Sequence, residues 1–419
     1  MSESPGMNPP ATTDDNGPQP LIGLAALMRQ AFAGVDLRPL GARLVERAKA
    51  YPQDANGLMD LSTILQLTGN RELGLATQMQ ALRLQQLYQL PSSSATAAIR
   101  LLAIMSGGDL MANTPVEFLV SGANVVLQQL YLDADIPLPQ QLPEHDVVFI
   151  ALGESDHNRP LLQQIAEQSR NWKKPLLNAP QAIAQLTRNG TCALLQGAPG
   201  IDMPLSVRVP RRQLQQVTME ELTLADILPG GAFPIIARPV GSHAGHDLDK
   251  IDDAAKLATY LAATPVEEFY ISRFVDYRSA DGLFRKYRIM LVDGAPFVCH
   301  MAISSHWMIH YLNAGMADSA EKRAEEARFM AGFEQDFAVR HARAFESVTA
   351  LLKLDYVGLD CAETQNGQLL VFEADSDMIV HDMDPVDMYP YKKPAMQKIF
   401  DAFYAMLARK VGRAGPAAG

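Results

Sequence analysis

Cysteine is scarce in this sequence: the three residues, Cys192, Cys299 and Cys361, lie far apart and are never spaced as CxxC. Their number and spacing argue against a disulfide framework and a cysteine-based zinc site, and they favour a reducing, cytoplasmic environment. Long apolar runs are also missing, since the run at residues 21–28 is far shorter than the roughly 20 residues that cross a bilayer. We therefore expect no membrane-spanning segment.

Positive charge is in deficit, with 36 Lys and Arg residues against 47 Asp and Glu residues and a net charge of -11. No basic cluster stands out, which argues against general affinity for nucleic acid or for an anionic membrane surface. The terminal segments look unstructured. Residues 1–20 are rich in Pro, Ser, Asp and Asn and lack the apolar core of an export signal, so we expect a disordered tail. We expect residues 411–419 to form a second flexible tail.

The bulk composition is that of a globular protein, with 48% hydrophobic and 20% charged residues over 419 positions. At roughly 100–200 residues per domain, this length predicts about two to four domains. Residues 21–95 form the first unit, because their apolar positions recur every three or four residues, as in helices. The helical hairpin at residues 55–88 loosely resembles one tetratricopeptide unit. Two roles stay open for it: a structural cap, or a platform for a peptide or protein partner or a second copy.

Strands alternate with helices from residue 96 to residue 185. Apolar runs at residues 99–105, 125–132, 146–152 and 174–178 read as buried strands, and residues 160–170 read as a helix between them. Such alternation predicts βαβ units in a mostly parallel sheet. The remaining unit, residues 186–410, mixes helices with strands at residues 235–239, 269–275, 285–292, 356–360 and 369–375, and is expected to be α+β.

Three carboxylates gather on the last two of these strands. Asp360 ends one strand, and Glu373 and Asp375 are two residues apart on the next, so they point to one face. A turn at residues 365–367 would pair the two strands. Converging carboxylates in an apolar setting repel one another unless a cation holds them, and Mg²⁺ shared with a triphosphate is a common solution. The alternative is a solvated acidic edge.

Positive and glycine-rich elements precede this hairpin. Arg188 and Arg238 could supply fixed positive charge to phosphates. Gly241 and Gly245 flank Ser242 in a loop after the strand at residues 235–239, and their missing Cβ atoms allow backbone amides to approach phosphate oxygens. His243 and His246 lie in the same loop.

Together, these motifs resemble the ATP-grasp superfamily, in the branch of glutathione synthetase and the glutamate-adding peptide ligases. The resemblance covers roughly residues 96–408. It implies a pre-grasp α/β domain at residues 96–185 and two α+β lobes that clamp ATP within residues 186–410. Asp360 with the Glu373-Ala374-Asp375 triplet matches the family's metal signature, and Arg288 matches its arginine near the transferring phosphate. ATP and Mg²⁺ are the implied cofactors.

The resemblance also implies roles for single residues, each at a matching position. Arg288 and Arg238 would be catalytic; Asp360, Glu373 and Asp375 would hold the metal. The implied nucleotide-binding residues are Arg188, Arg238, Gly241, Ser242, Gly245, Ser272 and Phe274. The sequence departs from the family in three ways: arginine replaces lysine at positions 188 and 238, Asp375 replaces asparagine, and Lys286 stands where relatives often carry a carboxylate.

The reaction implied by the resemblance is ADP-forming ligation of a carboxylate to an amine through an acylphosphate, with an amino acid or peptide as substrate. A nucleotide-binding adaptor without catalysis is the alternative. Candidate substrate residues are His300, His306, His310, Asn313 and His381. Two other roles stay open for the histidines. His306 and His310 would lie one turn apart on a helix and could hold zinc, although Trp307 replaces the glutamate of a metalloprotease motif, or they could be structural. Residues 321–326 read as an exposed helix face of mixed charge.

Overall fold

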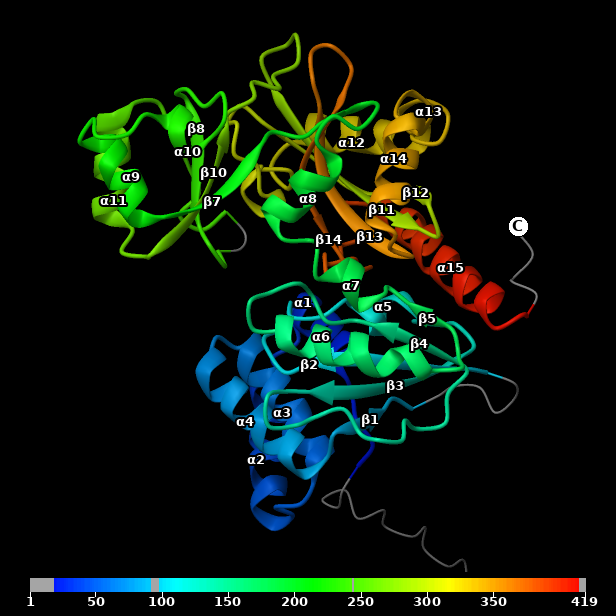
Figure 1. The fold of residues 1–419 in the computed structure, drawn as a ribbon. Helices are drawn as coiled ribbons and strands as arrows, with labels where there is room; N and C mark the ends of the chain where they lie inside the picture. The colour runs from blue at the N-terminus through cyan, green and yellow to red at the C-terminus, as the bar shows by residue number, and fades with distance from the viewer. Residues whose placement is uncertain (1–18, 92–97, 243–244, 414–419) are drawn as a thin grey trace, which may run out of the picture.

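The computed structural model describes residues 19–91, 98–242 and 245–413. Figure 1 shows a lower body and two upper bodies, with the C-terminal helix running between the lower and the right upper part. The predicted tails at residues 1–20 and 411–419 lie mostly outside the described residues. Within the described ranges, none of the helices is long and apolar enough to cross a membrane.

The N-terminal helices form one side of the lower body. They are α1 (Leu24–Phe32), α2 (Arg38–Ala50), α3 (Ala55–Leu67) and α4 (Arg71–Leu84). Asp54 caps α3, since its carboxylate accepts a hydrogen bond of 3.1 Å from the backbone N–H of Gly57. Gly69 adopts φ +85° in the turn to α4, a conformation that glycine reaches without strain. The predicted helical hairpin is thus confirmed.

A five-stranded sheet forms the rest of the lower body, in the order β1-β3-β2-β4-β5. Its strands are β1 (Leu87–Gln89), β2 (Ile99–Ser106), β3 (Val125–Leu132), β4 (Val147–Ile150) and β5 (Leu176–Leu177), with α5 (Val116–Leu119), α6 (Arg159–Gln168), the 3-10 turn η1 (Ser169–Asn171) and α7 (Pro180–Ile183). β2, β3, β4 and β5 are parallel, as the alternating pattern predicts, and β1 adds antiparallel to β3. Although β1 lies in the region predicted to be helical, it is a strand of this sheet.

The helices and this sheet share one hydrophobic core. Leu58 and Met59 of α3 and Leu82 of α4 are buried with Leu101 of β2 and Leu127 of β3. The same core continues into the C-terminal helix α15 (Lys392–Lys410), whose Phe400 and Phe403 belong to it. The N-terminal helices therefore cover apolar surface of the sheet.

The left upper body in Figure 1 is a small antiparallel sheet, β7-β10-β8-β9, with a core of its own. Its strands are β7 (Ser206–Pro210), β8 (Ile235–Pro239), β9 (Asp249–Ile251) and β10 (Glu268–Arg273). The helices α9 (Arg211–Thr218), α10 (Leu224–Ile227) and α11 (Ala254–Ala263) belong to it, and α8 (Arg188–Leu195) leads into it. We call this body the small lobe.

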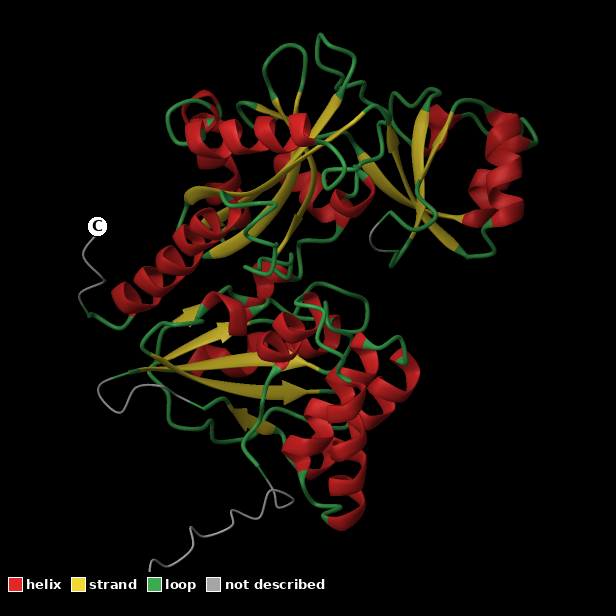
Figure 2. Ribbon diagram, turned by 180° about the vertical axis from the view of Figure 1, so that it is seen from behind, coloured by secondary structure: helices red, strands yellow, loops and turns green. Residues whose placement is uncertain are grey.

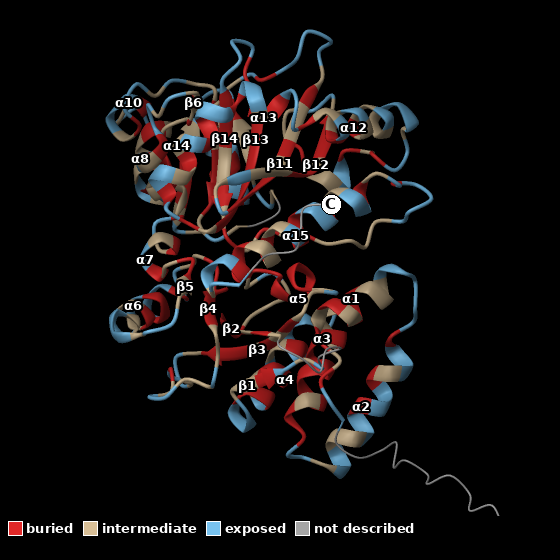
Figure 3. Ribbon diagram, turned by 90° about the vertical axis from the view of Figure 1, so that its right-hand side faces the viewer, coloured by how far each residue is buried: buried red, intermediate tan, exposed pale blue. Residues whose placement is uncertain are grey.

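The right upper body contains the longest strands, in the order β12-β11-β13-β14-β6. They are β11 (Phe284–Val292), β12 (Ala295–Ser304), β13 (Tyr356–Glu363), β14 (Leu369–Asp375) and the short β6 (Ile201–Asp202); the accompanying helices are α12 (Ala320–Gly332), α13 (Phe337–Arg340) and α14 (Ala342–Leu352), with η2 (Tyr311–Asn313). Figure 2 shows the strands side by side with the helices against them. Most strand residues are buried (Figure 3). The mixed α/β and α+β class is confirmed.

Two local structures differ from what the sequence suggests. The helix on which a zinc site at His306 and His310 depends is not formed, because residues 305–308 are bends and residues 309–310 have no regular structure. Glu326 of α12 is fully buried, although residues 321–326 read as an exposed face. Its carboxylate accepts hydrogen bonds from the backbone N–H of Met301 and from the Tyr311 and Tyr391 hydroxyls. These donors come from distant parts of the chain, so local charge patterning gives no sign of them.

Candidate functional site

The acidic hairpin of β13 and β14 is the starting point of the candidate site. Asp360 lies directly opposite Glu373, and Asp375 opposite Gly358, in an antiparallel register. A bulge follows Asp360. Glu373 and Asp375 are two residues apart on β14 and so share one face. The strand register therefore places the three carboxylates on one face of the hairpin, and their joint role as metal ligands stays a prediction.

Asp360 is engaged by two cations from β11. Its Oδ1 accepts a hydrogen bond of 2.8 Å from Arg288 Nε, and its Oδ2 accepts one of 3.1 Å from Arg288 Nη2. Lys286 Nζ lies 2.6 Å from the same Oδ2. Asp360 is 3% exposed, and the neighbouring cations hold its pKa far below the usual range in spite of the burial, which acts in the opposite direction.

Arg188 and Arg238 lie together beside Glu373. Arg188 is the first residue of α8 and pairs with Glu373 at 2.5 Å. Arg238, on β8 of the small lobe, is buried and donates to the backbone and hydroxyl oxygens of Ser242. Burial, and then repulsion from Arg188, lower the pKa of Arg238 to about 10. Among the described residues, no carboxylate lies within ion-pairing distance of Arg238.

Asp375 has two acidic neighbours that the sequence analysis did not identify. Its pKa is raised by burial and by Asp377, and burial raises the pKa of Asp377 to about 6. Glu154, in the loop after β4, is close enough for Asp375 to raise its pKa, although burial is the larger cause. Gly153 explains the close approach: a Cβ there would lie 1.8 Å from Asp377 Oδ2. Only a glycine leaves room for this side chain.

The donor set fits a Mg²⁺ ion in part. Asp375 Oδ1 is a buried carboxylate oxygen without a hydrogen-bond partner among the described residues, and Glu373 adds a second hard oxygen donor nearby. Magnesium in nucleotide sites takes one or two carboxylates together with substrate phosphates, so this pair suffices. Consistently, the described part of the chain holds no group of three or more His, Cys, Asp or Glu arranged for a metal. Asp360 fits poorly, because both of its oxygens bind cations.

The glycine loop after β8 turns back toward the right upper body. Gly241 and Gly245 have φ +76° and +75°, conformations that strain other residues. A Cβ on Gly245 would lie 3.2 Å from Met308 Sδ, so the loop approaches the segment after β12. His243 lies outside the described residues, and His246 is exposed and pairs with Asp247.

Ser272 and Phe274 lie at the end of β10, where the small lobe meets the segment after β12. Ser272 pairs in register with Ile236 of β8 and Ser206 of β7. The Phe274 ring packs edge-on against Trp307 at 5.8 Å and lies 4.7 Å from Lys250 Nζ. The two residues therefore lie where the small lobe borders the segment after β12.

The candidate substrate residues separate into two groups. His300, His310 and His381 have pKa values lowered mainly by burial, with further lowering from Arg288 or its neighbours. The lowered pKa values indicate neutral rings, and His300 lies directly opposite Arg288 on the neighbouring strand. By contrast, His306 and Asn313 are exposed, and Asn313 Oδ1 accepts a local hydrogen bond from the His310 N–H. The zinc alternative lacks support among the described residues.

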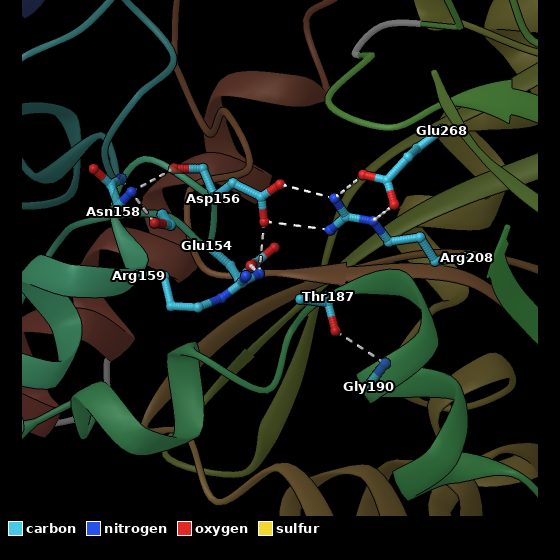
Figure 4. A network of polar contacts seen from close by, with 10 residues as sticks. Glu154, Asp156, Asn158, Arg159, Thr187, Gly190, Arg208 and Glu268 are labelled. Atoms are coloured by element: carbon cyan, nitrogen blue, oxygen red, sulfur yellow. Dashed lines mark hydrogen bonds and ion pairs between the residues drawn. The ribbon is translucent and has the colours of Figure 1, made fainter. Parts of the chain in front are cut away.

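Contacts between the bodies were not foreseen from the sequence. Figure 4 shows Asp156, in the loop after β4, bound to Arg208 of β7, which also binds Glu268 of β10. The Asp156 and Arg208 side chains are 3.2 Å apart at their closest. In addition, Arg29 of α1 pairs with Asp382 at 2.9 Å, just after the acidic hairpin. Charged residues of this kind are common on surfaces, so only the fold reveals their partners.

Comparisons with known proteins give a distant likeness only. No protein-family model and no curated protein matches the chain. Among solved structures, the chain is similar to a D-alanine–D-alanine ligase from Bacillus anthracis complexed with ATP, with 14% identity and a TM-score of 0.46 over 75% of this chain and 99% of that one. A D-Ala:D-Ser ligase from Enterococcus faecalis shows 13% identity and a TM-score of 0.47 over 74% and 100% of the two chains.

A RimK domain ATP-grasp protein from Sphaerobacter thermophilus is also similar, with 12% identity and a TM-score of 0.40 over 74% of this chain and 99% of that one. Likenesses of this size leave the family of the chain undecided. The function is therefore argued below from the residues of the site.

Proposed function

We propose that this chain is an ATP-grasp enzyme, an ATP-dependent and ADP-forming ligase that joins a carboxylate to an amine. The observation that carries the proposal is the pair of guanidinium groups of Arg188 and Arg238, which lie near one carboxylate, that of Glu373, while only Arg188 forms an ion pair with it. A buried charge is costly unless an opposite charge meets it. Arg238 is 8% exposed, so an anionic group beside it would offset the repulsion from Arg188. The phosphates of ATP supply such a group.

The proposed reaction has two steps. First, a substrate carboxylate oxygen attacks the γ-phosphorus of ATP, the bond to the β-phosphate oxygen breaks, and ADP leaves. Second, an amine attacks the carbonyl carbon of the acylphosphate; phosphate leaves, the nitrogen loses one proton, and an amide remains. Arg288 would stabilise negative charge on the transferring phosphoryl group, with Arg188 and Arg238 on the nucleotide phosphates. Mg²⁺ held by Glu373 and Asp375 would neutralise part of the triphosphate charge.

The substrate amine or carboxylate would meet the histidines beside Arg288. Because His300, His310 and His381 have lowered pKa values, they are neutral at pH 7 and can donate or accept hydrogen bonds without adding charge. Such rings suit an amino acid or a peptide, whose polar backbone needs both kinds of partner. We therefore propose an amino acid or peptide substrate.

One observation favours the alternative of a nucleotide-binding adaptor without catalysis. Asp360, the expected metal ligand, is bound through both oxygens to Lys286 and Arg288. An adaptor needs to hold a nucleotide but not to transfer a phosphoryl group. Formation of an acylphosphate distinguishes the two functions, because only the ligase forms this intermediate.

The test uses hydroxylamine, which converts an acylphosphate into a stable hydroxamate. The chain is incubated with ATP, Mg²⁺, hydroxylamine and pooled amino acids and dipeptides, and hydroxamates and phosphate are measured. We expect both products, and we expect Arg238→Gln to lower them at least tenfold through the lost charge on the phosphates. Arg212→Gln is the matched control, because Arg212 is an exposed residue of the same lobe. Nucleotide binding without any hydroxamate or phosphate would favour the adaptor.

A further inference from the structure

Lys286 has no role in the proposed ligase reaction, although it contacts Asp360. It lies two residues before Arg288 on β11, so the two side chains share one face of the strand. β11 pairs with β13, and Asp360 of β13 lies directly opposite Arg288. Lysine is compact, and its ammonium carries three donors on one nitrogen. Its recorded partner is Asp360, at 2.6 Å from Oδ2.

Asp360 has little capacity left for a metal ion. Oδ1 accepts from Arg288 Nε, and Oδ2 receives both Arg288 Nη2 and Lys286 Nζ. The carboxylate is almost fully buried, with its side chain 4% exposed, whereas the Lys286 side chain is 19% exposed and the Arg288 side chain 20% exposed. A metal bound to Asp360 would have to displace cations from this carboxylate and leave them in a poorly hydrated setting, which is costly.

The cluster of Asp360, Lys286 and Arg288 carries a net charge of about +1 without any metal, since one carboxylate meets two fixed cations. Glu373, opposite Asp360, has its own cation in Arg188. The neighbouring rings do not change this balance, because His300 and His310 are held neutral by burial and by the same cations. Only one edge of the Arg288 guanidinium is used by Asp360, while Nη1 has a long contact of 3.5 Å to the backbone oxygen of Ile379. Hydrogen-bond donors of Lys286 and Arg288 therefore remain available to bind an anion.

We propose that Asp360 is a positioning residue rather than a metal ligand, and that it holds Lys286 and Arg288 as fixed cations for the phosphates of a nucleotide. This rests on the proposed nucleotide site and goes beyond it. Lys286 is a phosphate-binding residue that takes the place of one divalent cation. Nucleotide binding consequently has a component that is independent of metal, and Mg²⁺ bound at Glu373 and Asp375 adds to it.

The first test is calorimetric titration of the full chain with ADP in EDTA and in excess Mg²⁺. We expect the affinities to differ by less than about tenfold, because the fixed cations remain in EDTA. Lys286→Gln should weaken binding in EDTA by about tenfold or more, the usual loss when a charged hydrogen-bonding partner is removed, and should make binding depend on Mg²⁺. Lys256→Gln is the matched control, since Lys256 is a half-buried lysine of α11 in the small lobe that pairs with Asp249.

The second test measures Mn²⁺ binding in the presence of ADP by electron paramagnetic resonance. Asp360→Asn should leave the Mn²⁺ affinity within about threefold of wild type, whereas Glu373→Gln should weaken it by about tenfold or more. A metal-ligand role of Asp360 would instead predict comparable losses of Mn²⁺ affinity in the two variants. Melting temperatures of both variants are recorded, and Lys286→Gln supplies the answer if Asp360→Asn does not fold.

The outcomes separate this inference from the proposed ligase function. Wild-type ADP binding that falls more than a hundredfold in EDTA, or an Asp360→Asn variant that loses Mn²⁺ as Glu373→Gln does, would overturn the inference and leave the ligase intact. Binding in EDTA without hydroxamate formation would overturn the ligase and leave the inference intact. Absence of ADP binding under either condition would overturn both.

Discussion

At the scale of single residues, burial raises the pKa of two carboxyl groups near the N-terminal helices, those of Asp60 and Glu117. Asp60 of α3 is 1% exposed and accepts hydrogen bonds from the backbone N–H groups of Ile22 and Gly23 at 2.9 and 3.0 Å. Glu117 of α5 likewise accepts a hydrogen bond of 2.8 Å from the backbone N–H of Ala25. Two buried carboxylates thus hold the start of α1, where the helix dipole favours negative charge.

The first prediction is a pH dependence of stability that comes from Asp60. Burial raises its pKa from 3.8 to about 6, so the folded state binds a proton more tightly than the unfolded state. The resulting stabilisation is complete below about pH 4 and is lost as the pH rises through 6; it amounts to about 3 kcal/mol. We expect urea unfolding of the wild type to show stability that falls from pH 4 to about pH 7, with most of the loss complete near pH 6.

The control for this prediction is the same titration of two variants. Asp60→Asn should remove that part of the slope, whereas Asp36→Asn should keep it, because Asp36 is exposed. Equal slopes in the wild type and in Asp60→Asn would show that Asp60 ionises alike in the folded and unfolded chain.

At the scale of elements, an ion pair joins the small lobe to the lower body. Asp156, after β4, meets Arg208 of β7, and Figure 4 shows this link together with Glu268 and Arg159. The link matters for the site because the small lobe carries Arg238, while the loop after β4 carries Glu154 beside Asp375. It therefore helps to keep the two halves of the site together.

The second prediction is that this link makes nucleotide binding sensitive to salt. Asp156→Asn should weaken ADP binding by about twofold to fivefold, because an exposed ion pair contributes up to about 1 kcal/mol. It should also reduce the loss of affinity between 50 and 500 mM NaCl, since added salt screens the wild-type pair. Calorimetric titration at both salt concentrations measures the two effects.

Glu268→Gln is the matched variant for the link, because Glu268 lies on β10 in the same lobe as Arg208 and does not bridge the two bodies. It should keep most of the wild-type affinity and salt response. If Asp156→Asn behaves like Glu268→Gln at both salt concentrations, the contact between the bodies has no part in nucleotide binding.

At the scale of the whole molecule, the N-terminal helices are part of one core with the α/β sheet. Leu82 of α4 is 2% exposed, and one of its methyl groups would lie 3.3 Å from a Cβ on Gly107, just after β2. Two roles are open to these helices from the sequence: a structural cap, or a platform for a peptide, a protein partner or a second copy. The shared core supports the structural role, and the recruitment role stays a prediction.

The third prediction follows from this core. Leu82→Asp should destabilise the chain by about 3 kcal/mol or more, because it buries an unpaired charge, whereas Leu73→Asp on the same helix should change stability by less than about 0.5 kcal/mol. Leu73 is 59% exposed. Urea unfolding measures both. A chain that begins at residue 94 should likewise be insoluble, and a soluble, monodisperse fragment that binds ADP would contradict the shared core.

Most positions of the helices and strands could be predicted from the sequence, because they depend on the local spacing of apolar residues. The strands β2, β3, β11 and β14 and the hairpin α3–α4 lie where their apolar spacing placed them. Short strands such as β1, with three residues, carry too little pattern to be recognised and form only because β3 offers a free edge.

The acidic hairpin and its arginines could also be predicted from the sequence. Residues two apart on a strand share a face, and the turn at residues 364–368 fixes the register of β13 and β14. The sequence by itself therefore determined the charges of the hairpin and its arginines, but not that Glu154 and Asp377 would lie beside them. Only the tertiary structure decided which charges meet: Lys286 with Asp360, Arg188 with Glu373, and Glu326 with two tyrosines. These partners are 15 to 185 residues apart in the chain, and nothing local to either one specifies the other, because their distance is set by the packing of whole sheets and helices.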